Sequence, residues 1–596
     1  MSQAVQKYSV NQHLIDQLLV WVSSGEIAIP EIQRPFVWKA SQVRDLLDSL
    51  YKGYPVGYLI TWKNPNIRLK DGSTSTGKKI LIDGQQRVTA LGAAILGLPV
   101  VGQDYRKRRI RIAFHPVEER FEVLNRAIER NPAWIPDIAE MFKADLLDFV
   151  EDYVTRSEVD RKAVSGSIQR LAGLGKRQIG LIDLDADLDI ETVTEVFIRI
   201  NSKGVVLSQA DFAMSKIAAS DAYGGPHLRK TIDYFCHLAK EPAVAAQVEV
   251  ADAAFTRTET WKQIAWLRDE TDDLYDPDYT DVLRVAFTSE FGRGKLSDLV
   301  ALLSGRNFAT REYEDDIARE SFERLTQGVK AFTSEWSFKQ FLMIVRSAGF
   351  VTSQMIRSRN ALNSAYILFL RLRRLKVAAP DIERFVRRWL ALSILTGRYS
   401  GASETALEAD ARLVDERFPE RFALLEQGDL SDAFWTVTLP QALDSSSSGN
   451  PRFQIFLAAQ VRDNDRGFLS REIRVKDLLT HRGDLHHLFP AAYLRGAGVV
   501  QTDRNQIANY AMMQAETNIA LGAKAPADYF SKLREQTEGG PLVFGAIDSP
   551  VALEANLAAH AVPSGITNMT AADYPGFLEA RRTLMADKMR RYYESL

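Results

Sequence analysis

The sequence has almost no cysteine and no long apolar run. Cys236 is the only cysteine in 596 residues, which excludes a disulfide framework and a cysteine-rich zinc site and fits a reducing compartment. The first residues, MSQAVQKYSV, lack the apolar core of a signal peptide. No apolar run approaches the length of about 20 residues that a membrane span needs. We therefore expect a cytoplasmic protein without a membrane partner.

The chain also lacks a strong excess of charge of either sign. Its net charge is −2, which argues against a uniformly basic nucleic-acid binder and leaves local basic patches for such contacts. A composition of 46% hydrophobic and 26% charged residues is that of an ordinary globular protein. There are no tandem repeats, and the only low-complexity linker is residues 444–450.

Histidine is scarce, yet it is concentrated in one place. Three of the eight histidines, His481, His486 and His487, fall within seven residues, and Pro490 ends the segment DLHHLFP. Two adjacent imidazoles are costly in an ordinary core, because buried polar groups need partners. Asn505, Asn509 and Asn518 follow downstream. Imidazole, amide oxygen and phosphate oxygen together can hold a divalent ion and leave one histidine as a base.

This segment resembles the HNH, or ββα-metal, nucleases. The likeness consists of His487-Leu-Phe-Pro490 as the end of a strand, Asn509 as the middle asparagine and Asn518 as the closing ligand. It implies that His487 is the general base, that His486 and Asn518 hold the metal, and that Asn509 fixes the loop that orients His487. The metal would be Mg or Mn, with Zn as a third candidate. The alternative is a surface histidine cluster in an amphipathic segment.

A second chemical centre lies at residues 79–96. A predicted strand, 79–82, runs into Asp83-Gly-Gln-Gln-Arg87 and then into a predicted helix, 88–96. Gly84 permits a tight turn, and a helix N-terminus presents free N–H groups to a phosphate. Arg87 can pair with phosphate, and Asp83 can hold Mg or a water that Gln85 and Gln86 orient. The alternative is a helix start with Arg87 in a structural salt bridge.

Three segments together favour the nucleotide interpretation: IPEIQRPFVW at 29–38, ILIDGQQRVTAL at 80–91 and FIRINSKGVVLS at 197–208. As a set, and over roughly residues 10–220, they resemble the ParB-like nucleotidase domain of the GmrSD group of type IV restriction enzymes, which cut modified phage DNA. The resemblance implies that GTP or ATP is hydrolysed by Asp83, Gln86 and Arg87. It places Gly84 and Gln85 in the same pocket, which is completed by Gln33, Arg34, Arg199 and Asn201.

Other segments carry weaker signals. Residues 11–23 have the apolar spacing of a helix, Ser41 is the expected N-cap of a helix over 41–50, and 58–62 is an expected strand. Within an apparent insertion at about 104–180, the run of arginines over 106–111 is either a phosphate-contacting stripe or a solvated strand edge. A second cluster of cations flanks Pro380 and is a candidate for nucleic-acid contact.

These observations predict an α+β, predominantly helical protein. The expected parts are a ParB-like mixed α/β domain over 1–220, a helical domain over 221–430, and an HNH-like nuclease domain with its ββα-metal motif in a helical frame over 431–596. The resemblances imply an NTP-dependent, modification-dependent DNA endonuclease of anti-phage defence whose partners are nucleotide and double-stranded, modified phage DNA. One alternative is a ParB-like, nucleotide-switched DNA-binding regulator without cleavage. Another is a non-specific metal nuclease whose N-terminal domain contacts a partner protein. Whether the chain forms a homo-oligomer stays open.

Overall fold

The computed structural model describes residues 7–24, 26–28, 38–63, 79–101, 107–188, 208–218, 220–481 and 483–596. Over these residues the chain is mostly helical with a few short strands, which confirms the predicted α+β, predominantly helical class. It divides into two compact units, Met1–Glu270 with Leu296–Glu323 and Thr271–Lys295 with Arg324–Leu596. The predicted boundaries at 220 and 430 stay predictions. Among the described helices, none has the length and apolarity to cross a membrane.

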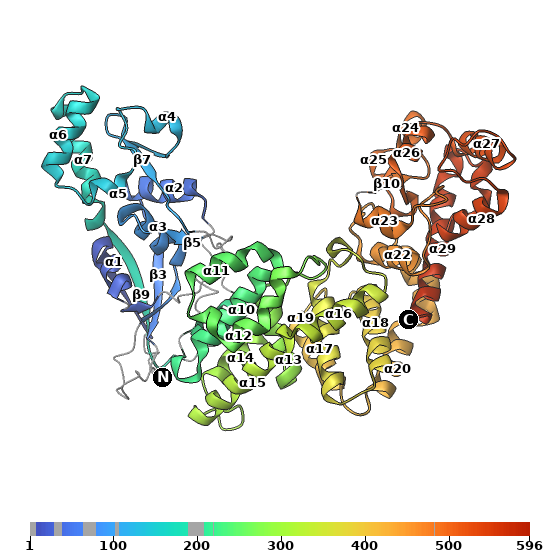
Figure 1. The fold of residues 1–596 in the computed structure, drawn as a ribbon, viewed down its shortest axis with the longest axis horizontal. Coiled ribbons are helices and arrows are strands. Elements are labelled where there is room, and N and C mark those ends of the chain that lie inside the picture. The colour runs from blue at the N-terminus through green and yellow to red at the C-terminus, as the bar shows by residue number, and fades with distance from the viewer. Residues whose placement is uncertain are drawn as a thin grey trace, which may run out of the picture. The chain divides into compact units, whose positions relative to one another are not determined.

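The first unit contains a five-stranded mixed sheet (Figure 1). In spatial order its strands are β1 (Tyr8–Leu14), β9 (Gln178–Leu184), β3 (Tyr58–Lys63), β4 (Lys79–Asp83) and β2 (Ile27–Ala28). β1 runs antiparallel to β9, and β3 runs antiparallel to β4, whereas the β9–β3 and β4–β2 pairs are parallel. The strands predicted at 58–62 and 79–82 are therefore confirmed.

Two helices cover this sheet. Apolar side chains of α1 (Ile15–Ser24) and α3 (Gln85–Ile95) share one buried cluster with the strands, in which Leu18 and Val88 contact the strand residues around Leu59. The helix predicted over 11–23 is wrong in its first part, because residues 8–14 form β1. Their pairing with β9, a segment far along the chain, overrides the local helical spacing. Helix α2 (Ala40–Tyr51) starts after Lys39, so Ser41 lies inside it and is not the cap.

The segment between α3 and β9 contains the residues of the predicted insertion. Its elements are β5 (Val100–Val101), β6 (Lys107–Arg108), β7 (Ile112–His115), β8 (Arg120–Val123), α4 (Arg126–Glu129), α5 (Ile138–Met141), α6 (Leu146–Ser157) and α7 (Arg161–Ala172). The β7–β8 hairpin and the helices α5–α7 share a second buried cluster with α2 and α3, so the insertion and the sheet domain have one continuous core. Of the cationic run over 106–111, Lys107 and Arg108 form β6, and β7 begins only at Ile112.

The rest of the first unit is helical. Its helices are α9 (Gln209–Ala218), α10 (Gly225–Lys240), α11 (Ala245–Ala251), α12 (Glu259–Ile264), α14 (Leu296–Leu303) and the first part of α15 (Asp315–Thr333).

The second unit is a helical frame that carries two short strands. Its helices are α13 (Tyr279–Phe291), α16 (Glu335–Ser347), α17 (Arg359–Arg374), α18 (Ala379–Thr396), α19 (Ser403–Leu413), α20 (Phe418–Asp429), α21 (Leu439–Ala442), α22 (Pro451–Arg462), α23 (Val475–Thr480), α24 (Ala491–Gly496), α25 (Gln501–Arg504), α26 (Ala515–Leu521), α27 (Pro526–Thr537), α28 (Pro550–Ala559) and α29 (Tyr574–Glu594).

The two strands of this unit are β10 (Asp484–His487) and β11 (Tyr510–Met513). They pair antiparallel, with His486 opposite Ala511 and His487 opposite Tyr510. In the chain α24 and α25 lie between the two strands, and α26 follows β11 after Gln514, so the antiparallel pair is followed by a helix. The low-complexity linker packs against this segment, because its Ser445 carbonyl accepts a hydrogen bond of 2.8 Å from the backbone N–H of Ile507.

Candidate functional site

His487 ends β10 in partly buried surroundings. Its Nε2 lies 3.1 Å from Oδ1 of Asn505, and its ring meets the ring of Tyr510 edge-on at 5.2 Å. Because an amide oxygen only accepts, Nε2–H is the donor, and the lone pair of the neutral ring is on Nδ1. Burial lowers the pKa of His487, and the nearby His486 and Arg504 lower it further, against a smaller opposing effect of Asn505. The ring is therefore mainly neutral at pH 7.

Asn509 holds the turn that follows His487. Its side chain is fully buried, accepts a hydrogen bond of 2.8 Å from the N–H of Phe489 and donates one of 3.1 Å to the carbonyl of the same residue. It also donates to the carbonyl of Arg504 at 3.2 Å, and its own carbonyl accepts from the N–H of Leu488. Asn509 thus fastens the chain on both sides of the connection between β10 and β11.

Residues of helix α29 also support the segment that connects β10 and β11. The fully buried Arg581 donates to the carbonyls of Ala508 at 2.8 Å and His560 at 3.1 Å, and burial lowers its pKa to about 9. The hydroxyl of Tyr574 donates to the carbonyl of Asp503 at 2.9 Å, and the ring of Phe489 packs against that of Tyr574. These supporting residues were not predicted from the sequence, because an arginine in a basic helix resembles a surface residue.

His486 and His487 are neighbours on one strand, so their side chains leave it on opposite faces. The two imidazoles therefore have different surroundings and can do different work. Asn518 lies half-buried in α26, and its amide makes no hydrogen bond to another described side chain or backbone group. Within the described part of the chain no group of three or more histidine, cysteine or acidic side chains could hold a metal. Imidazole and amide oxygen are ligand types that divalent ions accept, and the metal-binding roles expected for His486 and Asn518 stay predictions.

The second centre, Asp83 to Arg87, lies where β4 passes into α3. Gly84 has φ +95°, and a Cβ there would lie 2.1 Å from Cδ2 of Leu59, so only glycine fits this turn. The side-chain amide of Gln85 donates to the carbonyl of Leu81 at 3.1 Å, and Gln86 lies half-buried in the first turn of α3.

Arg87 fastens this junction to β3. Its guanidinium donates to the carboxylate of Asp83 at 2.9 Å and to the carbonyls of Tyr58 at 2.8 Å and Val56 at 3.3 Å. Gly57 leaves room for it, because a Cβ there would lie 2.8 Å from Nη1 of Arg87. The structural salt bridge that was the alternative to phosphate binding is thus present. Gln33, Arg34, Arg199 and Asn201 lie outside the described residues.

Comparison with known proteins bears on the first unit. An uncharacterized protein of Methanocaldococcus jannaschii is 22% identical over 167 residues, which is 27% of this chain and 27% of that protein. The chain therefore matches only about a quarter of that relative's length. Residues 15–218 match the family model described as the GmrSD restriction endonuclease, N-terminal domain. This segment, which holds the sheet except for β1, the Asp83–Arg87 junction and the insertion, is thus similar to the N-terminal domain of GmrSD restriction endonucleases.

Proposed function

We propose that this protein is an NTP-dependent, modification-dependent DNA endonuclease that acts in anti-phage defence. The observation that carries the proposal is the neutral His487, held by Asn505 at the end of β10 and followed by a turn that Asn509 fastens. The family match over residues 15–218 supports DNA as the substrate and restriction as the role. The antiparallel pair of β10 and β11, followed by α26, supports an HNH-like ββα arrangement in which α24 and α25 are inserted between the two strands.

In this proposal His487 is the general base. With its proton on Nε2 and bound to Asn505, the ring takes a proton from water at Nδ1, and the water oxygen attacks the phosphorus of the DNA backbone. The bond from phosphorus to the leaving oxygen breaks, and that oxygen takes up a proton from solvent. Asn509 keeps the ring in place through the turn at Phe489. A divalent ion held by His486 and Asn518 would stabilise the charge that develops on the phosphate.

The junction at Asp83 to Arg87 is proposed as the nucleotide site. The first turn of α3 offers backbone N–H groups and the positive end of its dipole to phosphate. Asp83 and Gln86 are the residues proposed for hydrolysis. Arg87 already donates hydrogen bonds to the carboxylate of Asp83 and to the carbonyls of Val56, just before β3, and Tyr58, in β3. Its proposed role is therefore to position Asp83 rather than to bind phosphate directly.

The competing function is a nucleotide-switched DNA-binding regulator that does not cut. Incubating the purified chain with plain, hydroxymethylated, glucosylated and phosphorothioated DNA separates the two. Each DNA is tested with and without Mg or Mn and with and without ATP or GTP. The endonuclease proposal expects metal-dependent cleavage of at least one modified DNA that responds to nucleotide. Binding without any cleavage in every combination would favour the regulator.

A further inference from the structure

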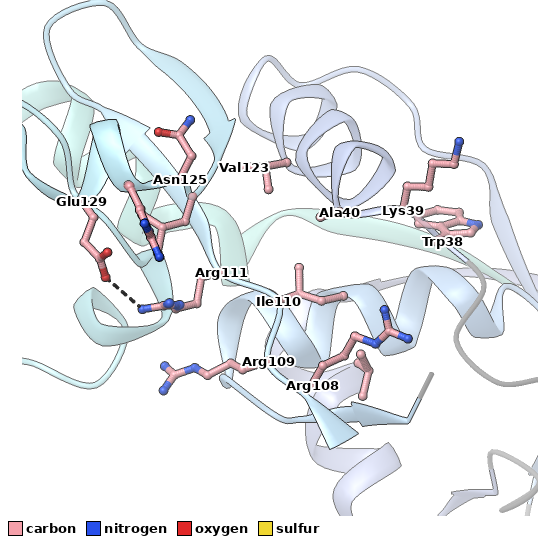
Figure 2. Close-up of a pocket in the computed structure, with 13 residues that line it drawn as sticks. Trp38, Lys39, Ala40, Arg108, Arg109, Ile110, Arg111, Val123, Asn125 and Glu129 are labelled. Carbon is pink, nitrogen blue, oxygen red and sulfur yellow. Dashed lines mark hydrogen bonds and ion pairs between the residues drawn. The ribbon is translucent and has the colours of Figure 1, made fainter. Parts of the chain in front are cut away.

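A cavity of about 650 Å³ lies in the first unit, between the start of α2 and the insertion (Figure 2). Its wall combines apolar side chains such as Ile110 and Val123 with the indole of Trp38. Among the described residues, five cationic side chains line it against a single carboxylate, that of Glu129. The cations are Lys39, Arg108, Arg109, Arg111 and Arg126. In a chain with a net charge of −2, this is a marked local excess of positive charge.

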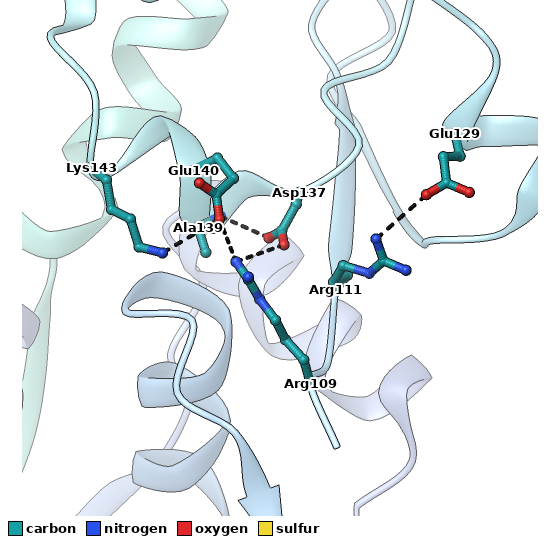
Figure 3. A network of polar contacts seen from close by, with 7 residues as sticks. All are labelled: Arg109, Arg111, Glu129, Asp137, Ala139, Glu140 and Lys143. Carbon is teal, nitrogen blue, oxygen red and sulfur yellow. Dashed lines mark hydrogen bonds and ion pairs between the residues drawn. The ribbon is translucent and has the colours of Figure 1, made fainter. Parts of the chain in front are cut away.

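The cations differ in how firmly they are held. Nη2 of Arg109 lies 3.0 Å from Asp137 and 2.5 Å from Glu140, so two carboxylates fix that guanidinium (Figure 3). Arg111 has a weaker contact, because its Nη1 lies 3.5 Å from Glu129 and both side chains are about half exposed, at 49% and 51%. An ion pair that long and that exposed contributes little and is easily exchanged for another anion.

Two further cations of the wall are less restrained than Arg109. Within the described part of the chain, the side chains of Lys39 and Arg126 make no ion pair. Lys39 lies beside Trp38, directly before the first residue of α2 (Figure 2). Arg126 and Glu129 belong to α4. Lys39, Arg111 and Arg126 therefore surround the cavity as charges able to receive phosphate oxygens.

The remaining wall fits a flat apolar group. Trp38 packs partly against the buried cluster that joins α2 to the insertion, so its ring is held rather than free. An indole and arginine planes are the surfaces on which unpaired bases stack. A volume of about 650 Å³ falls within the range of small-molecule pockets, roughly 300–1,000 Å³. Cations that can bind phosphate, beside an aromatic ring on which a base can stack, match the two parts of a nucleotide.

We propose that this cavity binds an unpaired nucleotide of a DNA strand. Its phosphates would lie on Lys39, Arg111 and Arg126 and its base against Trp38. A base inside a duplex has to leave its stack to enter such a pocket, so single-stranded or locally opened DNA is the expected ligand. The proposal rests on the proposed function only in taking DNA as the substrate. It needs no cleavage.

The test is DNA binding by the full-length chain in EDTA, which removes the divalent ions that a metal-dependent nuclease needs for cleavage. Fluorescence anisotropy follows a short labelled single strand and the matching duplex over a range of salt concentrations. The parental protein should bind the single strand more tightly. The double variant Arg111→Gln, Arg126→Gln should bind the single strand on the order of tenfold more weakly. Its salt slope should be smaller by about 0.7 for each phosphate that the variant no longer neutralises.

Two further variants make the result specific. Glu129→Gln removes the competing carboxylate and should tighten binding by about threefold, a gain that misfolding cannot produce. Arg161→Gln is the matched control, because Arg161 forms an ion pair of 3.4 Å with Glu151 at 54% and 66% exposure on α7 and does not line the cavity. It should bind like the parental protein.

Three results would overturn the proposal. One is a double variant that binds DNA like Arg161→Gln. Another is a Glu129→Gln variant with unchanged affinity. The third is a double variant that keeps DNA binding and instead loses binding of free ATP or GTP, measured in parallel, which would assign the cavity to free nucleotide. If His487→Ala and parental proteins both bind DNA through this cavity but neither cuts, the proposed endonuclease function fails while this inference stands.

Discussion

Replacing Asn509 by alanine tests how the histidine segment is built. The fully buried amide serves the N–H and the carbonyl of Phe489 and the carbonyl of Arg504. The carbonyl of Arg504 keeps a partner in Asn509→Ala, because the hydroxyl of Tyr574 also donates to it at 3.1 Å. The two groups of Phe489 lose theirs. At about 1–3 kcal/mol for each of these two buried groups left unsatisfied, the expected loss of stability is roughly 2–6 kcal/mol.

The same variant should cut DNA far more slowly. The turn at Phe489 starts two residues after His487, and a displacement of about 1 Å of a catalytic group can cost about 10²-fold in rate. Urea unfolding of the full chain, followed by tryptophan fluorescence, measures the stability, and plasmid nicking measures the rate.

Asn556→Ala is the matched control for this variant. Asn556 is also buried and also joins backbone groups, accepting from the N–H of Leu469 and donating to the carbonyl of Gly467, but it does not touch the turn after His487. It should lose comparable stability and keep its cleavage rate where it is folded. If Asn509→Ala retains both stability and rate, the account of this turn is refuted.

Three other predictions concern the metal, the nucleotide and acid. His486→Ala and Asn518→Ala should each raise the Mg or Mn concentration for half-maximal cleavage at least about tenfold without changing DNA affinity, and unchanged midpoints in metal titrations would refute the ligand assignment. Arg87→Ala releases Asp83 and should slow NTP turnover on the order of 10² and change phage protection in plaque assays; parental turnover would refute it. Burial lowers the pKa of His560 to about 3 from an ordinary 6.5, so the folded state binds that proton more weakly than the unfolded state. Stability is then complete above about pH 6.5 and lost as the pH falls toward 3, by roughly 2–3 kcal/mol at pH 4.5. Urea unfolding at both pH values should show this loss, and His560→Gln should remove much of it.

Local sequence signals predicted the elements that depend on nearby residues. The strand–turn–helix at Asp83 to Arg87 follows from the apolar run over 80–82 and from Gly84, whose φ of +95° needs a glycine. The N-terminal segment 8–14 could not be assigned in the same way. Its strand exists because it pairs with β9, whose residues 178–184 lie beyond the whole insertion, and a local helical spacing carries no information about that partner.

The charged clusters show a second limit of the sequence. The cations around Pro380 looked like one basic surface, yet Arg374 pairs with Glu290, Arg387 with Glu383 and Arg388 with Glu426. Two of these three carboxylates come from other helices and are not adjacent in sequence. The run over 106–111 had the same appearance, but there the structure adds a cavity and leaves some of its charges with weak partners. From the sequence, Asn505 could be noted only for its spacing from the histidines. The structure shows that its side chain forms a hydrogen bond with His487.

The rate of DNA cleavage by His487→Ala tests the central claim most directly. His487 makes one side-chain hydrogen bond, to the partly exposed Asn505, so the variant should fold and melt like the parental protein. Loss of the base should lower plasmid nicking by about 10² to 10⁴, with DNA binding in EDTA and NTP turnover unchanged. Because burial lowers the pKa of His487, the parental rate should also persist below the pH at which an ordinary imidazole is protonated. A folded His487→Ala protein that nicks plasmid at the parental rate would contradict the account.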